Sequence, residues 1–463
     1  MRLLIICSVI IPILFLGNIV RANINPWVAN SVYDPQKWDT AGPYTATPWL
    51  HPPTFIPDQG WGVFSGKWRT TGVLTGSWGV YRDKLLERWG ISVTSAYFGQ
   101  LAANPTGGVK QGTSWKGDIG AAIFVDLERL VGWKRGYFTA SFSYKHGTDT
   151  LSSVYIKNLF PVQLASGDNN GAARLVHLAF GQQLFNNNAE FVIGRLIAGE
   201  DFASLRLACT SLNQAICANP IAGAQSISFP VYPFATWGAR FKLQPGKAWY
   251  AQVGSYIVNQ NFRNPDFHGV KFSVPDSSGP LILGEFGYIV GNYRGKPGLP
   301  GKYKVGGYYD GERLEELKTG DNVRGTWGIY AMGEQMLFSE DDKYIEGLSS
   351  FLALSFAPEN RNRITFMAAG GLSYRGPIPN RSSDALAFVA AYGHFSGDLP
   401  RGMGENGELL PKQDYELLLE LNYRIQIAPW AFVEPDVQVI INPDGRSEID
   451  DALVIGFALG VVL

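Results

Sequence analysis

The segment YELLLELNYRIQI, from Tyr415 to Ile427, places apolar and polar side chains on alternate residues. Every second residue from Tyr415 is aliphatic or aromatic, while the residues between them include Glu416, Glu420 and Arg424. A period of two is typical of a β-strand, whose successive side chains point to opposite faces. The segment therefore requires a sheet with one apolar surface and one surface that accepts both signs of charge.

Fifteen further segments of similar character occur between residue 91 and the C-terminus. The sixteen predicted strands are 91–101, 118–127, 137–147, 173–185, 189–198, 236–244, 248–258, 280–290, 302–311, 326–338, 348–357, 363–375, 385–396, 415–427, 431–441 and 452–463. Most are about ten residues long, whereas globular strands average about 5–6 residues and tilted membrane strands need about 9–11. We therefore predict an all-β fold, a transmembrane antiparallel β-barrel of about 16 strands.

A soluble β-sandwich is the alternative, because a core-facing sheet produces the same alternation. That fold would need long strands throughout and aromatic residues concentrated in its core. Aromatic residues instead lie near the predicted strand ends, as the interfacial girdles of a membrane barrel do; examples are Tyr415, Trp430, Trp237, Trp249, Tyr374 and Tyr392. The mean hydropathy of −0.03 argues against a multi-helix membrane protein.

The first 22 residues predict export. A basic Arg2, an apolar run and a Val20-Arg21-Ala22 cleavage site are typical of a secretory signal peptide, with an uncleaved anchor helix as the alternative. Removing Arg2 and Arg21 leaves 37 basic against 40 acidic residues, and this near neutrality gives no indication of nucleic-acid binding.

The remaining chain divides into two parts. Residues 23–75 are rich in Pro and Trp and have no strand or helix period, so we predict an irregular periplasmic extension. Residues 76–463 form the predicted barrel domain, which begins with a short amphipathic periplasmic helix at 77–89. Cys209 and Cys217 are eight positions apart in a polar segment of an exported chain, which predicts a disulfide within one loop.

The predicted connections alternate in length. Tight turns follow Phe185, Gln244 and Ile427, and longer segments fall between them at 202–235, 259–279 and 397–414. Short periplasmic turns and long outer loops are the pattern of outer-membrane barrels, although the segment near Pro358 is short for an outer loop. Pro435 predicts a bulge or local break in its strand.

Charged residues occur at positions that would face a water-filled lumen. A Lys or Arg facing lipid at mid-bilayer would cost about 2–4 kcal/mol, so these side chains should point inward. The predicted pore-lining and substrate-contacting residues are Arg240, Lys242, Glu416, Glu420, Asn422, Arg424, Glu434, Asp436 and Arg195. Apolar and polar residues do not alternate regularly in segment 189–198. Arg195 is therefore predicted either in the lumen or at a strand end.

Two catalytic interpretations are open to the sequence. His394 and Ser396 have the His-x-Ser spacing of outer-membrane phospholipases, but Gly397 and Asp398 stand where Asn and Arg should follow. The strand carboxylates could also form a glycosidase pair. A pore lining accounts better for acids and bases spaced along strands, because opposite charges at a constriction set a field and offer fixed hydrogen-bond partners. We predict no enzyme activity, no cofactor and no metal site.

The chain resembles the carbohydrate-selective porins of the OprB type from GSWGVYRDKLLERWGIS to the C-terminus. The matching stretches include DLERLVGWKRGYFTASFSYKHG, IGRLIAGEDF, KVGGYYDG, GPIPNRSSD and YRIQIAPWAFVEPDVQVIINP. The resemblance implies a sixteen-stranded, often monomeric barrel with infolded outer loops and a lumen of Arg and acidic residues. The segment with Cys209 and Cys217 would then be the third outer loop. The chain departs from the pattern by ending in Leu463 rather than an aromatic residue.

The prediction from these observations is a porin of a Gram-negative outer membrane, allowing passive, carbohydrate-selective diffusion of sugars such as glucose. A less selective porin for small hydrophilic solutes, an outer-membrane barrel enzyme and a secreted soluble β-protein are the alternatives. Expected partners are mono- and oligosaccharides, outer-membrane lipid and lipopolysaccharide, and the barrel-assembly machinery. We expect a monomer that binds no nucleic acid.

Overall fold

The computed structural model describes residues 73–463, except 79, 149, 166–172, 218, 260, 265–267, 276–277, 292–296, 343 and 404–408. The predicted signal peptide and residues 23–72 of the predicted extension lie outside the described residues. Among the residues that are described, no helix has both the length and the apolar character needed to span a membrane.

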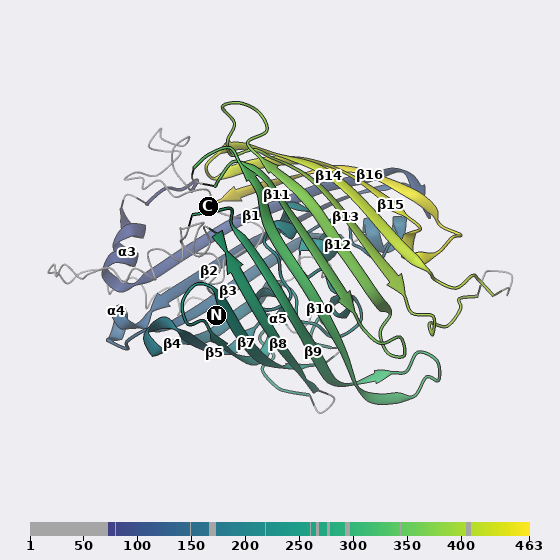
Figure 1. Ribbon diagram of the computed structural model, residues 1–463, viewed down its shortest axis with the longest axis horizontal. Helices are drawn as coiled ribbons and strands as arrows, with labels where there is room; N and C mark the ends of the chain where they lie inside the picture. The colour runs from purple at the N-terminus through teal and green to yellow at the C-terminus, as the bar shows by residue number, and fades with distance from the viewer. Residues whose placement is uncertain are drawn as a thin grey trace, which may run out of the picture.

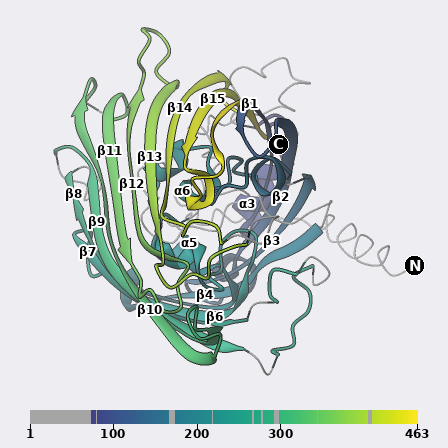
Figure 2. The same cartoon turned by 90° about the vertical axis from the view of Figure 1, so that its right-hand side faces the viewer.

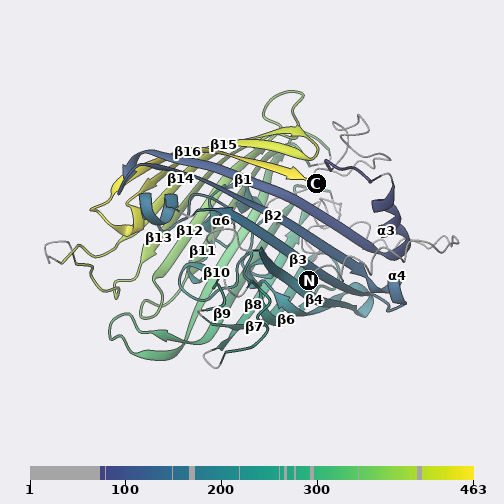
Figure 3. The same cartoon turned by 180° about the vertical axis from the view of Figure 1, so that it is seen from behind.

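Sixteen antiparallel strands form one closed barrel, in which each strand pairs with its neighbours in sequence and β1 pairs with β16. Figure 1 shows the strands tilted across the barrel, and Figure 3 shows the β1–β16 seam from behind. The strands are β1 (Ile91–Gly108), β2 (Gly112–Asp126), β3 (Gly136–Gly147), β4 (Ala173–Leu184), β5 (Ala189–Leu196), β6 (Thr236–Leu243), β7 (Trp249–Val258), β8 (Gly279–Val290), β9 (Gly301–Glu315), β10 (Asn322–Ser339), β11 (Gly347–Phe356), β12 (Ile364–Arg375), β13 (Ala385–Phe395), β14 (Tyr415–Ala428), β15 (Ala431–Ile441) and β16 (Asp450–Val462).

The predicted fold class is therefore confirmed, and each predicted segment overlaps one strand. Four strands (β1, β2, β9 and β10) extend several residues beyond the prediction. In β1, for example, the pairing with β2 continues to Asn104↔Gly112, through a stretch without apolar alternation. Backbone hydrogen bonds to two neighbouring strands hold such residues extended whatever their side chains are, so the sequence pattern carries no signal there.

The barrel is apolar outside and polar inside. On β8, Ile282 and Phe286 are 44% and 47% exposed, whereas Glu285 between them is 5% exposed. On β14, Leu421 is 50% exposed while Glu420 and Asn422 are buried. Large apolar side chains exposed around a closed barrel are stable only against lipid, because water would oppose that exposure. The alternation predicted for β14 is confirmed.

Inward-facing aromatic residues pack across the strands against glycines. Tyr250 is paired with Gly287, and a Cβ on that glycine would lie 2.0 Å from the Tyr250 ring. Tyr330 is paired with Gly306 in the same way, at 2.3 Å from a Cβ placed there. A large ring that covers a neighbouring glycine pins the register and fills the inner surface of the wall.

The two ends of the barrel differ in the length of their connections. The turns at 185–188, 244–248 and 429–430 lie at one end, which we call the turn end. The segments at 197–235, 259–278 and 396–414 lie at the other, the loop end, together with the short connection at 357–363. The long segments lie at one end as predicted, although the loop end also has short connections at 109–111 and 316–321. Pro435 has no pairing partner on β14, but the register of β14 and β15 is the same on both sides of it. The structure therefore has a local break at Pro435 and not a bulge.

A short helix lies at the turn end, where Figure 1 shows it beside the C-terminus. This helix, α3 (Tyr81–Trp89), begins later than the predicted 77–89 because Trp78 and Val80 have left-handed φ values of 52° and 75°. Arg82 donates to the carbonyls of Val93 and Leu463, and Arg129 of α4 (Leu127–Val131) donates to the carbonyl of Leu86. These bonds fix the helix to the rim.

Candidate functional site

The connection at 197–235 folds into the barrel and crosses its interior. It contains α5 (Ala198–Asp201), η6 (Leu207–Thr210), α6 (Gln214–Cys217) and η7 (Ala222–Gln225). Figure 2 shows α5 and α6 inside the ring of strands. We call this segment the inner loop. Its apolar residues Phe202, Ile216, Ile221 and Phe229 are fully buried, so they form a core within the barrel that narrows the open cross-section.

Glutamates of the barrel wall hold the backbone of the inner loop. Glu285 on β8 accepts a hydrogen bond from the Ala203 N–H at 2.9 Å. Glu334 on β10 accepts from Leu207 at 2.9 Å, and Glu420 on β14 from Leu212 at 2.6 Å. A buried carboxylate is stable where backbone N–H groups donate to it, and bonds of this charge-assisted kind are about twice as strong as neutral ones.

A second connection, at 148–172, also packs into the interior through the π-helix η4 (Leu151–Ile156). The Glu416 carboxylate accepts hydrogen bonds from the N–H groups of Leu159 and Phe160, at 2.6 and 2.9 Å. On β15, Gln438 donates to the Val162 carbonyl at 2.9 Å. The same chemistry that holds the inner loop therefore holds this second loop against β14 and β15.

Basic residues of the wall also hold the inner loop. Arg240 on β6 forms ion pairs of 2.5 Å with Glu190 and 2.9 Å with Asp201 of α5. Lys304 on β9 donates to the Ser204 carbonyl at 2.6 Å. Burial raises the pKa of Asp201, and the neighbouring Arg240 guanidinium opposes that rise. An ion pair this deeply buried fixes the position of α5 because separating it would leave each charge without compensation.

Eight of the nine predicted pore residues lie on the inner face of the barrel. They are Arg240, Lys242, Glu416, Glu420, Asn422, Arg424, Glu434 and Asp436, and all but Arg424 are more than nine-tenths buried. Arg424 is 17% exposed and donates to Glu434 at 2.8 Å. These side chains face inward as predicted, but most bind the inward loops or one another. Their contact with a passing solute stays a prediction.

Arg195 does not join the other eight. On β5 it shares a face with Ile193, which is 47% exposed, and lies opposite the face of Glu190. Its guanidinium is 6.0 Å from the ring of Phe272 in the connection at 259–278. Arg195 lies at the end of its strand, which was the second of the two predicted placements. β5 ends one residue later, at Leu196.

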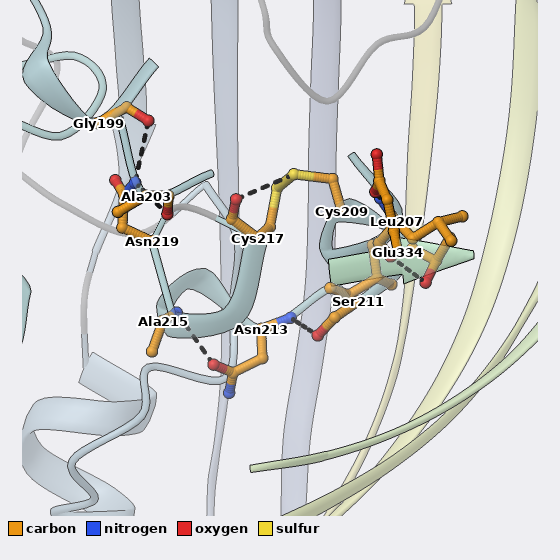
Figure 4. Close-up of a disulfide and its surroundings, with 12 residues drawn as sticks. Gly199, Ala203, Leu207, Cys209, Ser211, Asn213, Ala215, Cys217, Asn219 and Glu334 are labelled. Atoms are coloured by element: carbon orange, nitrogen blue, oxygen red, sulfur yellow. Dashed lines mark hydrogen bonds between the residues drawn. A yellow bond between two sulfur atoms is a disulfide. The ribbon is translucent and has the colours of Figure 1, made fainter. Parts of the chain in front are cut away.

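Cys209 and Cys217 form a disulfide within the inner loop (Figure 4). It links η6 to α6, and between the two cysteines Asn213 accepts a hydrogen bond from the Ala215 N–H at 3.1 Å. The segment between the two cysteines also binds the barrel wall, because the Ser211 hydroxyl donates to Glu420 at 2.5 Å. The disulfide therefore closes the part of the loop that is attached to β14 and β15.

The sequence analysis missed two basic residues beside Arg424. Arg375 ends β12 on the inner face, and the pairings Arg375↔Ala385 and Ala385↔Arg424 place two arginines in one row across β12, β13 and β14. Arg206 of the inner loop lies close enough to Arg375 for their charges to interact. All three retain contact with water, and we call them the arginine cluster.

The alternation in β12 could have identified Arg375 as an inward-facing residue, because Arg375 shares a face with the small, buried residues Ala369 and Ser373. No such signal existed for Arg206, which is part of an irregular loop. The acids Glu346 and Asp341 of the neighbouring turn interact with Arg375, so the cluster combines both charge signs beside the open lumen.

A family model described as "Carbohydrate-selective porin, OprB family" matches residues 110–463. The chain belongs to this family. With its closed sixteen-stranded barrel, it is a carbohydrate-selective porin of a Gram-negative outer membrane, and family and fold indicate a channel rather than an enzyme. Because outer-membrane barrels carry their longer loops outside, the loop end of this porin is extracellular.

The porin is similar to two proteins known by sequence. It is 27% identical to Porin B of Pseudomonas aeruginosa over 419 residues, which cover 84% of this chain and 91% of the relative. It is 27% identical over 422 residues to the putative porin QuiX of Acinetobacter baylyi, covering 83% and 92% of the two chains. The high-pH structure of Pseudomonas putida OprB has the same fold, with a TM-score of 0.77 at 24% identity, over 84% of this chain and 98% of that one.

Proposed function

We propose that neutral sugars of monosaccharide size, such as glucose, diffuse passively past the arginine cluster. The observation that carries this proposal is the row formed by Arg375 and Arg424 on either side of Ala385. A small residue between two guanidinium groups leaves space above the wall, and Arg206 of the inner loop approaches the row from inside. Solutes that cross the constriction would therefore meet several fixed donors.

The chemistry of the cluster suits hydroxyl groups. Each guanidinium offers five N–H donors and no acceptor, and a sugar hydroxyl can accept from one group while it donates to a carboxylate. Glu346, which is partly exposed, supplies a nearby carboxylate. A neutral sugar can exchange its water shell for these partners without the strong attraction that a free charge would feel. Binding of this moderate strength allows both entry and release, which conduction requires.

A less selective porin for small hydrophilic solutes is the alternative within the class. The close Arg424–Glu434 pair argues for sugar selectivity, because an arginine neutralised at 2.8 Å attracts anions weakly while its remaining N–H groups still donate. Equal permeation by neutral and anionic solutes of one size would support the less selective alternative.

The proposal is tested by the conductance of single channels in planar bilayers while glucose, succinate and phosphate are titrated. We expect glucose to reduce ion current through the wild-type channel, and Arg375→Gln to weaken this block by about tenfold through loss of charged donors. Arg313→Gln is the matched control, since Arg313 is exposed near the loop-end terminus of β9. Equal block by all three solutes, or equal glucose block of both variants, would contradict the proposal.

We also propose that the porin has no hydrolytic activity. Ser396 donates to the Glu359 carbonyl at 2.7 Å, while His394 lies 3.6 Å from Asp414, so the described contacts of the two residues run to different partners. Glu416 and Glu420 are bound by loop backbone and have no room for a glycoside. Lipid or glycan hydrolysis that disappears in His394→Ala would contradict this proposal.

We further propose that the porin works as a monomer, inserted by the barrel-assembly machinery and surrounded by lipopolysaccharide. A single chain closes the barrel and supplies both inward loops, so a pore needs no second copy. Light scattering of the purified, detergent-solubilised porin should give the mass of one chain after the detergent contribution is subtracted. A stable mass of three chains would contradict the monomer.

A further inference from the structure

We propose that the outer surface of the porin binds a phosphate group of an outer-leaflet glycolipid at the loop end of β9 and β10. The site consists of Arg313 on β9, Arg324 on β10 and Arg361 in the connection at 357–363, together with the hydroxyl of Tyr309. The inference rests on the outer-membrane location of the porin and not on its sugar selectivity.

Two arginines of the site are a cross-strand pair. Arg313 and Arg324, which we call the rim pair, are directly opposite each other on β9 and β10. Side chains in such positions share a face with their Cβ atoms about 4.5–5.5 Å apart, and two like charges there are destabilising. Both arginines are exposed, and in the described part of the chain neither forms an ion pair, although Glu315 follows on the same face. The rim pair therefore favours an anion that the chain itself does not supply.

A third arginine is fixed beside the rim pair. The loop-end part of β10 has no partner on β11, because that pairing starts at Ile329. The connection at 357–363 covers this open edge, where Arg361 donates to the carbonyl of Arg324 at 2.9 Å and to the carbonyl of Gly325. These two bonds order the Arg361 guanidinium next to Arg324, so its position is set before any ligand binds.

The rim pair faces away from the lumen. The next pair along the two strands is Leu314↔Val323, and Leu314 is buried in the core inside the barrel. Because successive side chains of a strand point to opposite faces, the rim pair points outward. Tyr309 lies on the same outer face of β9. A Cβ on Gly325 would be 2.5 Å from the Tyr309 hydroxyl, so this hydroxyl reaches the residue next to Arg324.

Aromatic residues mark the level of the membrane interface just below the rim pair. Tyr309 and Trp327 are paired and are 49% and 46% exposed, and the Trp327 ring is 6.1 Å from the ring of Phe356. Exposed Trp and Tyr residues of membrane barrels lie at the interfaces of the bilayer. Arg324 is about 10 Å from Trp327 along the strand, at about 3.3 Å per residue. Since the loop end is extracellular, the rim pair lies at the level of the outer-leaflet headgroups.

A phosphorylated glycolipid suits this surface better than other headgroups do. Guanidinium groups bind phosphate oxygens with parallel N–H bonds, and a tyrosine hydroxyl adds a further donor. A zwitterionic headgroup would bring its own ammonium group toward three arginines, which a phosphorylated sugar does not. Salt screens the attraction of exposed arginines for a free phosphate ion, whereas acyl chains hold a lipid phosphate at this level of the barrel. The lipid is therefore the source of the phosphate.

The site is tested with folded porin in a neutral detergent. Native mass spectrometry measures how much of a bisphosphorylated glycolipid, and of its dephosphorylated form, the porin retains. We expect wild type to retain the bisphosphorylated form preferentially. Arg324→Gln should weaken that binding by about five- to tenfold, through loss of charge-assisted hydrogen bonds. Arg324→Lys keeps the charge but not the parallel N–H donors, so its binding should be intermediate.

The control is Lys247→Gln, which removes one charge from an exposed turn at the opposite end of the barrel and should leave glycolipid binding unchanged. Heat-modifiable migration on a detergent gel verifies that each variant has folded. Equal retention of the two glycolipid forms by wild type, or equal losses in Arg324→Gln and Lys247→Gln, would overturn the site. Isothermal titration with inorganic phosphate is the second arm, and binding of the free ion as strong as that of the glycolipid would overturn the assignment to a lipid. None of these measurements depends on sugar transport.

Discussion

The Glu420 carboxylate on β14 accepts a 2.6 Å hydrogen bond from the N–H of Leu212, which lies 208 residues earlier in the chain. Glu420 also accepts from the Ser211 hydroxyl at 2.5 Å and from the Asn422 amide at 2.7 Å. Glu334 and Glu285 hold other parts of the same loop. The acids of the wall therefore set the position of the inner loop, and through it the width of the channel.

Removing the Glu420 carboxylate should loosen the inner loop. Glu420→Ala leaves the buried Leu212 N–H without its acceptor, which costs about 1–3 kcal/mol and shifts local opening by roughly 5- to 150-fold. We expect larger single-channel conductance with more current noise. Glu420→Gln keeps an acceptor oxygen and should have the smaller effect. Identical conductance of wild type and Glu420→Ala would show that the carboxylate does not position the loop.

Opening the disulfide should have a related effect on the channel. Cys209 and Cys217 are separated by 8 positions, and closing a loop of this length stabilises it by about 2–3 kcal/mol in the chain-entropy estimate. Reductant should increase current noise in the wild-type channel and should change the intact mass by two hydrogens. The double variant Cys209→Ser, Cys217→Ser should be noisy from the start and insensitive to reductant. A wild-type mass that reductant leaves unchanged would exclude the bond.

The arginine cluster should set the ion preference of the open channel. Arg375→Gln removes a charge that is exposed in the lumen, so the relative permeability to cations should rise. The measurement is the reversal potential in a potassium chloride gradient, at low and high ionic strength, because salt screens exposed charges. Arg313→Gln should leave the reversal potential unchanged. A shift of equal size in both variants would mean that the position of Arg375 in the lumen is unimportant.

Asp384, in the turn that precedes β13, should contribute stability that depends on pH. Burial alone would raise its pKa, but hydrogen bonds from Arg381, the Gln426 N–H and Tyr423 outweigh burial and hold the pKa below its usual value of 3.8. A carboxylate whose pKa is lower in the folded state stabilises the fold above its unfolded pKa. That contribution is lost as the pH falls through the folded pKa.

Asp384→Asn should accordingly destabilise the porin by about 1–2 kcal/mol at pH 7, a moderate value because Arg381 is partly exposed. The difference from wild type should shrink at a pH well below 3.8, where the Asp384 carboxylate of the wild type takes up a proton. Denaturant midpoints at the two pH values measure this. Asp321→Asn, at an exposed position of the loop end, should have little effect at either pH. Equal destabilisation by Asp384→Asn at both pH values would rule out the ionised carboxylate as the cause.

The cross-strand pair of Tyr250 and Gly287 predicts a difference between two glycines of β8. An added methyl at Gly287 would meet the Tyr250 ring at 2.0 Å, whereas a methyl at Gly284 would have no atom within 4 Å. Gly287→Ala should therefore cost about 1–3 kcal/mol, the usual penalty of overpacking. Gly284→Ala should be close to neutral. Similar unfolding midpoints for the two variants would show that the ring moves aside freely.

The sequence alone determined the barrel. Residues such as Leu421 and Glu420 alternate in strands long enough to cross a bilayer, and a strand has only two faces, so the pattern specifies which side chain meets lipid. The same pattern placed Arg240, Glu416 and Glu434 on the inner face. It also left Arg195 unassigned, where the strand ends and the period no longer applies.

Only the tertiary structure decided what the inner face does. The acids predicted to meet solutes are covered by loops whose backbone N–H groups they bind, as Glu420 binds Leu212. Arg375 and Arg424 became neighbours through the register of β13, and Arg206 joined them through a fold of the inner loop. The side chains of the inner loop have no period that fixes their direction. Their partners depend on contacts between residues hundreds of positions apart, which local sequence does not encode.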